Sequence, residues 1–156
     1  MATFKQIQAR IQKISEEALQ EVVDMYVRKW RDLVARSYED NFRTNGHAPY
    51  NYGRTGDVWS SIGSFPIEIY GASMSMTFGY DTSEISPAFE GGWNAHMSIY
   101  GEDTSESIPY WIEKGTTSKI YSYEGIEAID YLTEYIKKNY QRDIKKALQK
   151  RGLSIN

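Results

Sequence analysis

The stretch that decides the fold runs from Phe4 to Val34 and reads FKQIQARIQKISEEALQEVVDMYVRKWRDLV. Its apolar residues recur at steps of three and four, which is the period of one stripe along an α-helix. The stripe consists of Phe4, Ile7, Ile11, Ile14, Ala18, Val22, Met25, Tyr26, Trp30, Leu33 and Val34. The pattern therefore predicts one long amphipathic helix.

The expected bounds of this helix are residues 3–44, because no glycine occurs before Gly46 and no proline before Pro49. At 1.5 Å per residue such a helix is about 60 Å long. A single small domain cannot cover so long an apolar stripe. We therefore expect the helix either to bend back on itself or to pack against another subunit.

The rest of the chain predicts a small β-rich region followed by a second helix. A short helix is expected over residues 55–62, with Thr55 as its cap. A β-rich region is expected over residues 65–116. It begins with a hairpin of residues 65–70 and 73–80, whose second strand alternates polar and apolar side chains.

The same β-rich region contains an expected long loop over residues 81–107, with room for a short strand at residues 97–100. Residues 108–116 are expected to end as a strand and turn. The last helix is expected over residues 124–151, with Gly152 as its stop signal. This order predicts one α+β domain spanning residues 1–156, with helices packed on a small antiparallel sheet.

Composition excludes several classes of protein. The chain has 156 residues, of which 40% are hydrophobic and 25% charged, which is typical of a folded domain. The absence of cysteine excludes disulfides, thiolate chemistry and iron–sulfur clusters. No apolar run is long enough to span a membrane, and the first residues lack the apolar core of a secretory leader, so we expect neither.

The net charge of −3 is unevenly distributed along the chain. Residues 1–46 carry a net +1 and residues 126–156 a net +3, whereas residues 47–125 hold three basic and ten acidic residues. A protein that binds nucleic acid tightly normally carries a large basic surplus. The acidic middle segment is the more unusual feature.

No pattern of residues indicates catalysis, a metal or a cofactor. His47 and His96 stand far apart, and no HExxH spacing occurs. Asp81, Glu84 and Glu90 lack the spacing of a calcium loop. The chain also has no GxSxG, GxGxxG or GxxxxGK[ST] motif, so we expect a protein that is not an enzyme and binds no cofactor.

Aromatic residues in the less regular segments point to contact with other molecules, since tyrosine and tryptophan are enriched at interfaces. The candidate subunit-contact residues are Phe89, Trp93, Tyr100, Tyr110 and Trp111. Two alternatives stay open. Such rings can stack on sugars in a carbohydrate- or receptor-binding module, and two acids of the middle segment can form the pair of a small hydrolase.

Two short motifs carry a family resemblance. Residues 52–62, YGRTGDVWSSI, resemble the R-T-G-x-L-x-x-S-I element of the tail-completion or head–tail joining proteins (tail terminators) of long-tailed bacteriophages. Residues 108–116, IPYWIEKGT, resemble the Y-A-x-Y-V-E-x-G-T element of the same family. The matching motif residues are Arg54, Thr55, Gly56, Glu113, Gly115 and Thr116. The family's P-F-L-R-P-A segment has no counterpart, because residues 118–123 read SKIYSY.

The resemblance implies a virion structural protein, assembled in the host cytoplasm, that forms a six-fold ring in the phage neck. Such a ring completes the tail tube or joins the tail to the head, contacts other neck and tail-tube proteins, and lets DNA pass without specific binding. In that setting we expect residues 81–107 to reach a neighbouring subunit. We also expect the acids of residues 47–125 to face the DNA passage in part, the alternative being that they keep loops solvated.

Overall fold

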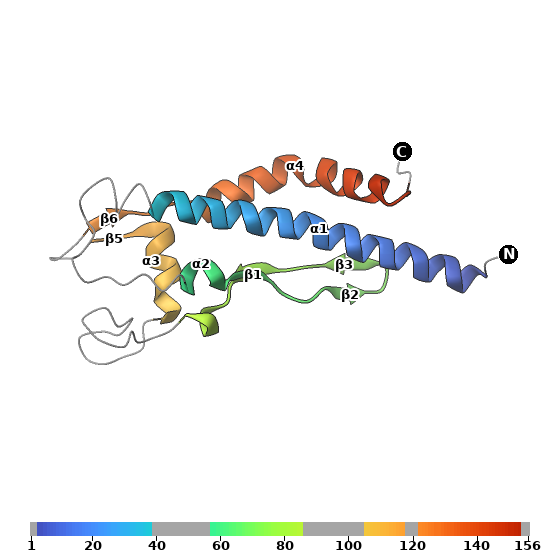
Figure 1. Cartoon of the computed structure of the whole chain (residues 1–156), viewed down its shortest axis with the longest axis horizontal. Coiled ribbons are helices and arrows are strands. Elements are labelled where there is room, and N and C mark those ends of the chain that lie inside the picture. Colours follow the sequence, from blue (N-terminus) through green and yellow to red (C-terminus); the bar gives the residue numbers. More distant parts are fainter. Residues whose placement is uncertain (1–2, 39–56, 86–104, 118–121, 154–156) are drawn as a thin grey trace.

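The structure of the protein is a computed structural model that describes residues 3–38, 57–85, 105–117 and 122–153 (Figure 1). Its longest element is α1, Phe4–Tyr38. In Figure 1, α4, Ala128–Lys150, lies along one side of α1, and a β-hairpin lies along the other side. The architecture is α+β, as the sequence predicts.

The α1 helix is one continuous helix of 35 residues. It begins with a reciprocal pair of hydrogen bonds, in which the Gln6 backbone N–H donates to Thr3 Oγ1 and the Thr3 N–H donates to Gln6 Oε1. This is a capping box, which satisfies two of the free donors at a helix start. Over Phe4–Tyr38 the helix does not fold back on itself. The expected continuation to residue 44 lies outside the described residues.

The hydrophobic core sits where α1 meets α4 and the hairpin. Full burial of a side chain as large as valine, leucine or phenylalanine stabilises the fold by about 1.5–3 kcal/mol. Tyr26 and Trp30 are the large aromatic members on α1, and both pack against Phe78 of the hairpin. The buried members are Ala18, Leu19, Val22, Val23, Tyr26, Val27, Trp30, Val34, Ile62, Ala128, Leu132 and Ala147.

A hydrogen bond inside this core ties α1 to α4. The Tyr26 hydroxyl donates to Asp143 Oδ2 at 3.2 Å. Burial of the ring and the neighbouring Asp143 carboxylate both raise the pKa of Tyr26 above its ordinary value. Tyr26 is therefore a neutral donor at neutral pH.

The predicted hairpin is present, but its first strand begins at Ile62 instead of residue 65, and its ladder is interrupted once. Strand β1, Ile62–Ser64, pairs antiparallel with β4, Phe78–Tyr80. Farther out, β2, Glu68–Tyr70, pairs with β3, Ser73–Ser75, around a turn in which Gly71 has a φ of 61°. The two ladders are separated beside Pro66, which has no N–H to donate to a ladder.

The predicted bounds of the first short helix are wrong by one residue at the end that the structure describes. Helix α2 covers Asp57–Ser61, and Ile62 is already the first residue of β1. Ile62 is fully buried and its carbonyl accepts a hydrogen bond from Arg31 Nε at 2.8 Å. The extended conformation places this carbonyl beside α1.

The prediction of a β-rich region through residue 116 is also wrong. The 3-10 turns η2, Thr82–Glu84, and η3, Ser105–Ser107, lie within the expected loop. Helix α3, Ile108–Lys114, then follows in place of a strand end. Pro109 lies in the first turn of α3, where its fixed φ suits a helix. Ile108 and Ile112, one helical turn apart, are both buried.

The last helix begins four residues later than predicted. Residues 122–124 form β6, Ser122–Glu124, which pairs with β5, Gly115–Thr117. Residues 125–127 then connect β6 to α4, which starts at Ala128. At the other end, Gly152 stops the helix as predicted, with a φ of 84° and a hydrogen bond from its N–H to the Gln149 carbonyl.

The close approach of Gly125 to the backbone at the end of α3 generates the first prediction. A Cβ at Gly125 would collide with the Glu113 carbonyl oxygen and with the Lys114 backbone, and it would lie 2.6 Å from the Gly115 nitrogen. Because these atoms are backbone, they cannot rotate away. We expect Gly125→Ala to lower the free energy of unfolding by about 2–3 kcal/mol in urea titration.

Gly63→Ala is the matched control, because a Cβ at Gly63 has nothing within 4 Å. It should stay within about 1 kcal/mol of the wild-type protein. Equal stability of the two variants would contradict the close approach of residue 125 to the end of α3.

Candidate functional site

The residues nominated by sequence fall into two groups in the structure. Phe89, Trp93, Tyr100, Arg54, Thr55 and Gly56 lie outside the described residues, as do the expected strand at residues 97–100 and the side chains of Trp111 and Thr116. The described nominees are Tyr110, Glu113 and Gly115. Tyr110 is 66% exposed and so is available for contact. Glu113 and Gly115 lie at the end of α3.

The Glu113 carboxylate accepts three hydrogen bonds, and the residue is only 3% exposed. Its Oε1 accepts hydrogen bonds from Trp30 Nε1 at 3.2 Å and from the Tyr80 hydroxyl at 2.8 Å. Its Oε2 accepts from the Ile129 backbone N–H at 3.0 Å. The carboxylate therefore joins α1, β4 and α4 from its position on α3. We call this set of four residues the Glu113 junction.

The junction also caps α4. The residue before the helix, Glu127, has a left-handed conformation, with φ 49° and ψ 31°, and its own side chain makes no cap hydrogen bond. The Glu113 carboxylate takes that role from another element, because it accepts from an N–H in the first turn of α4. A negative charge at this helix end is favoured by the helix dipole.

The backbone around Glu113 holds the carboxylate in place. The Ile126 N–H donates to the Ile112 carbonyl and the Glu127 N–H donates to the Glu113 carbonyl, each at 3.0 Å. Gly115 leaves α3 with a φ of 81°, a conformation that glycine adopts without strain. Glu113, the first residue of the E-x-G-T motif, is thus a buried joint between α3 and α4. Nothing in this arrangement offers a nucleophile or an open site for chemistry.

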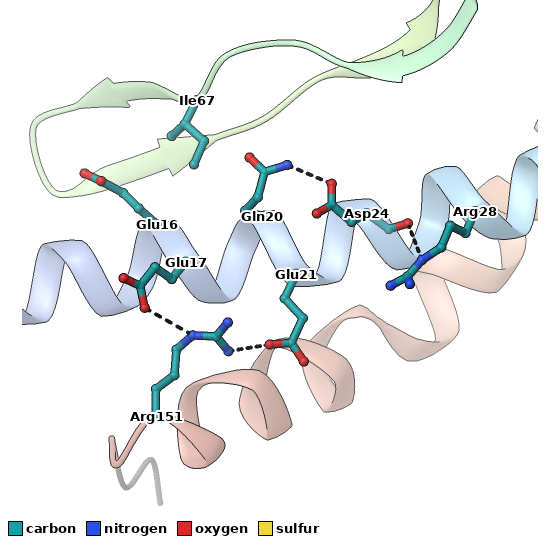
Figure 2. Close-up of a pocket in the computed structure, with 8 residues that line it drawn as sticks. All are labelled: Glu16, Glu17, Gln20, Glu21, Asp24, Arg28, Ile67 and Arg151. Atoms are coloured by element: carbon teal, nitrogen blue, oxygen red, sulfur yellow. Dashed lines mark hydrogen bonds and ion pairs between the residues drawn. The ribbon is translucent and has the colours of Figure 1, made fainter. Parts of the chain in front are cut away.

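A second feature is an open acidic groove of about 510 Å³ beside α1, drawn in Figure 2. Ile67 reaches into it from the hairpin side and Arg151 from the end of α4. Its four carboxylates all come from α1, and its lining is Glu16, Glu17, Gln20, Glu21, Asp24, Arg28, Ile67 and Arg151. Over the described ranges, no group of three potential ligands is placed to hold a metal ion.

The groove's charges are used to fasten α4 to α1. Arg151 pairs with Glu21 at 2.6 Å and with Glu17 at 3.6 Å, and Lys150 pairs with Glu21 at 3.0 Å. These ion pairs lower the pKa of Glu21 below its ordinary value of 4.5, with Lys150 as the largest cause and Arg151 next. We call the ion pairs of Arg151 and Lys150 with Glu17 and Glu21 the clamp, because they hold the last turn of α4 against α1.

Beyond this clamp, α1 has no packing partner among the described residues. Every residue from Phe4 to Lys13 is exposed. Three members of the predicted apolar stripe lie here in water, because Phe4 is 80%, Ile7 48% and Ile11 46% exposed. Figure 1 shows that this end of α1 extends past both the hairpin turn and the end of α4. We call residues 4–13 the α1 arm.

Comparison with known proteins gives no relative. No family model matches the chain, and no curated protein or solved structure matches it. Among the described helices, none is long and apolar enough to cross a membrane.

The Glu113 junction generates the second prediction. Glu113→Gln keeps the shape of the side chain but replaces one acceptor oxygen by a donor. In either orientation of the amide, at least one of the Trp30 and Ile129 N–H groups loses its acceptor. A buried donor without a partner costs about 1–3 kcal/mol, and we expect that loss in the free energy of unfolding.

Glu106→Gln, the same change at an exposed position, is the control and should fall within about 0.5 kcal/mol of the wild type. Both variants are measured by urea unfolding followed by tryptophan fluorescence. A Glu113→Gln protein as stable as the control would show that the junction contributes nothing to folding.

The clamp generates a third prediction, on pH. Because folding lowers the pKa of Glu21, its contribution to stability is present above pH 4.5 and is lost as the pH falls through the folded-state pKa. Glu21→Gln should therefore lower the melting temperature modestly at pH 7. The difference from wild type should disappear in acid.

Glu84→Gln serves as the control, because Glu84 is exposed and forms no ion pair within the described segments. Melting curves of all three proteins across the acid range measure the effect. A Glu21→Gln difference that persists unchanged at low pH would rule out the ion pairs as its cause.

Proposed function

We propose that the protein is a structural component of the virion of a long-tailed bacteriophage, and that it forms a ring in the neck. In this role it completes the tail tube or joins the tail to the head, and DNA passes through the ring. The proposed role is not enzymatic. Its partners are further copies of the same chain and the neighbouring neck and tail-tube proteins.

The observation that carries the proposal is the α1 arm. A helix that leaves its first three turns in water, with Phe4, Ile7 and Ile11 exposed on one face, has apolar surface for which the described fold provides no cover. Contiguous exposed apolar surface is typical of an interaction site. A subunit of a larger assembly accounts for this surface, as the resemblance to neck proteins implies.

The charge of the part between α1 and α4 fits the same role. Residues 57–85 and 105–114 hold six acidic residues and one basic residue, whereas most of the basic residues lie on α1 and α4. Each basic side chain on a phosphate adds affinity for DNA that is independent of sequence. A passage lined by this middle part would let a duplex slide without being held.

The test of the proposed function is an image of intact particles from the phage that encodes the chain. We expect a ring of six copies between the head and the tail tube, with α1 and α4 visible as adjacent rods. We also expect particles made without the gene to consist of separate heads and tails. Joined, infectious particles without the protein would overturn the proposal.

The alternative reading as a carbohydrate-binding module keeps one supporting observation, which is the exposed Tyr110 ring. A glycan array probed with the purified protein tests it. Binding that is lost in Tyr110→Ala, together with the absence of the protein from virions, would favour this alternative.

A further inference from the structure

The α1 arm raises the question of what covers it. The ion pairs of Arg151 with Glu17 and Glu21 fix where α4 ends along α1. Ile14 is the first residue of the stripe that is partly buried. The arm is therefore about 15 Å of helix, at 1.5 Å per residue, without tertiary packing within the described protein. Isolated helices of this length are marginal in water.

The arm is basic as well as apolar. Lys5, Arg10 and Lys13 give it a net charge of +3, and it contains no acidic residue. None of the three forms an ion pair with the described part of the chain. At 3.6 residues per turn, Arg10 and Lys5 border the face of Phe4, Ile7 and Ile11 from its two sides, whereas Lys13 lies opposite it. An occupant of this face should therefore offer apolar contact with negative charge at its edges.

The opposite end of the folded molecule offers both apolar contact and negative charge. Turn η2 contacts turn η3, and both rest on a small core of Val58, Ile85, Ile108 and Ile112. Glu84 and Glu106 stand exposed on these turns, and neither carboxylate has an ion-pair partner within the described ranges. The exposed Tyr110 follows on α3. We call Glu84, Glu106 and Tyr110 the acidic corner.

The two surfaces cannot meet within one molecule. Figure 1 places η2 and α3 at the end of the long axis away from the N-terminus, and the arm occupies the other end. A helix of 35 residues separates them along much of its length, which is about 50 Å. Complementary surfaces at opposite ends of one subunit can meet only between two copies.

We infer that the α1 arm of one copy docks on the acidic corner of a second copy, in a head-to-tail contact. Phe4, Ile7 and Ile11 supply the apolar face, and Lys5 and Arg10 at its two edges meet the corner's carboxylates. Because the two contacting surfaces differ, the contact is heterologous, and repetition of it gives a ring or a filament. This inference rests on the proposed function in one respect only, which is that the repeated contact closes into a ring.

Two other occupants fit less well. Pairing of two arms with each other would bring two +3 surfaces together, which is unfavourable. An anionic membrane surface would attract the arm, but it would repel the acidic body behind it. A second copy meets neither objection. The contact also gives Glu84 and Glu106 a role other than facing the DNA passage.

A charge-swap experiment tests the contact. The arm-reversed variant carries Lys5→Glu, Arg10→Glu and Lys13→Glu, and the corner-reversed variant carries Glu84→Lys and Glu106→Lys. Each variant alone should associate about a hundredfold more weakly than wild type, because like charges then face each other. An equimolar mixture should regain assembly, because each variant's arm is complementary to the other's corner.

The matched control reverses three exposed basic residues of α4, Lys138, Lys145 and Lys146, to glutamate. It should assemble as the wild type does. Sedimentation at low and high salt measures all five samples, and added salt should weaken wild-type assembly. Ile7→Ser, which removes an exposed side chain, should weaken assembly about tenfold without changing the melting temperature.

Three results would overturn the contact. The corner-reversed variant could assemble like wild type, the wild type could stay monomeric up to its solubility limit at low salt, or the wild type could bind anionic vesicles through the arm while remaining a monomer. Failure of the contact and failure of the proposed function are distinct. Neck rings that survive every reversal would leave the phage role intact, whereas assembly without any neck density would support the contact and remove that role.

Discussion

The fold depends on how the Glu113 carboxylate is placed in the interior. A buried carboxylate is costly unless hydrogen bonds replace the water that it has lost. Here the Trp30 indole, the Tyr80 hydroxyl and the Ile129 N–H supply that replacement from three different elements. Each of those elements must therefore hold its position for the charge to be tolerated. The requirement makes the junction a geometric constraint on the end of the molecule where α1, α3, the hairpin and α4 meet.

The opposite end of the molecule is held differently. There the last turn of α4 is fastened by the partly exposed ion pairs of Arg151 and Lys150 with Glu17 and Glu21, and ion pairs that solvent reaches contribute little to stability. Packing continues as far as the clamp, where Ala18 and Ala147 are still buried, and past the clamp α1 continues alone among the described residues. This boundary separates the two tasks of α1. Its middle forms the core, and its first three turns remain available to another molecule.

Sequence periodicity was sufficient for the two long helices and for the hairpin, because each of these has a local apolar pattern and a local stop signal. It was not sufficient for residues 108–116. The aromatic and β-branched side chains there favour a strand, but Pro109 and the burial of Ile108 and Ile112 on one helical face favour a helix, and the helix formed. The Glu113 junction could not be derived at all, since its donors lie 83 and 33 residues away in the sequence. Glu113 itself was marked only by its place in the E-x-G-T motif, which contains none of its three donors.

The placement of α1 and α4 at the two ends of the sequence has a consequence for how the chain is made. Tyr26 and its partner Asp143 are 117 residues apart, so translation at about 5–20 residues per second leaves an interval of roughly 6–23 s between them. During that interval the side of α1 that will meet α4 has no cover from it. The hairpin can close on the other side much earlier. Folding of the finished chain is then governed by the closure of one very long loop, which raises the contact order and slows the reaction relative to a bundle of adjacent helices.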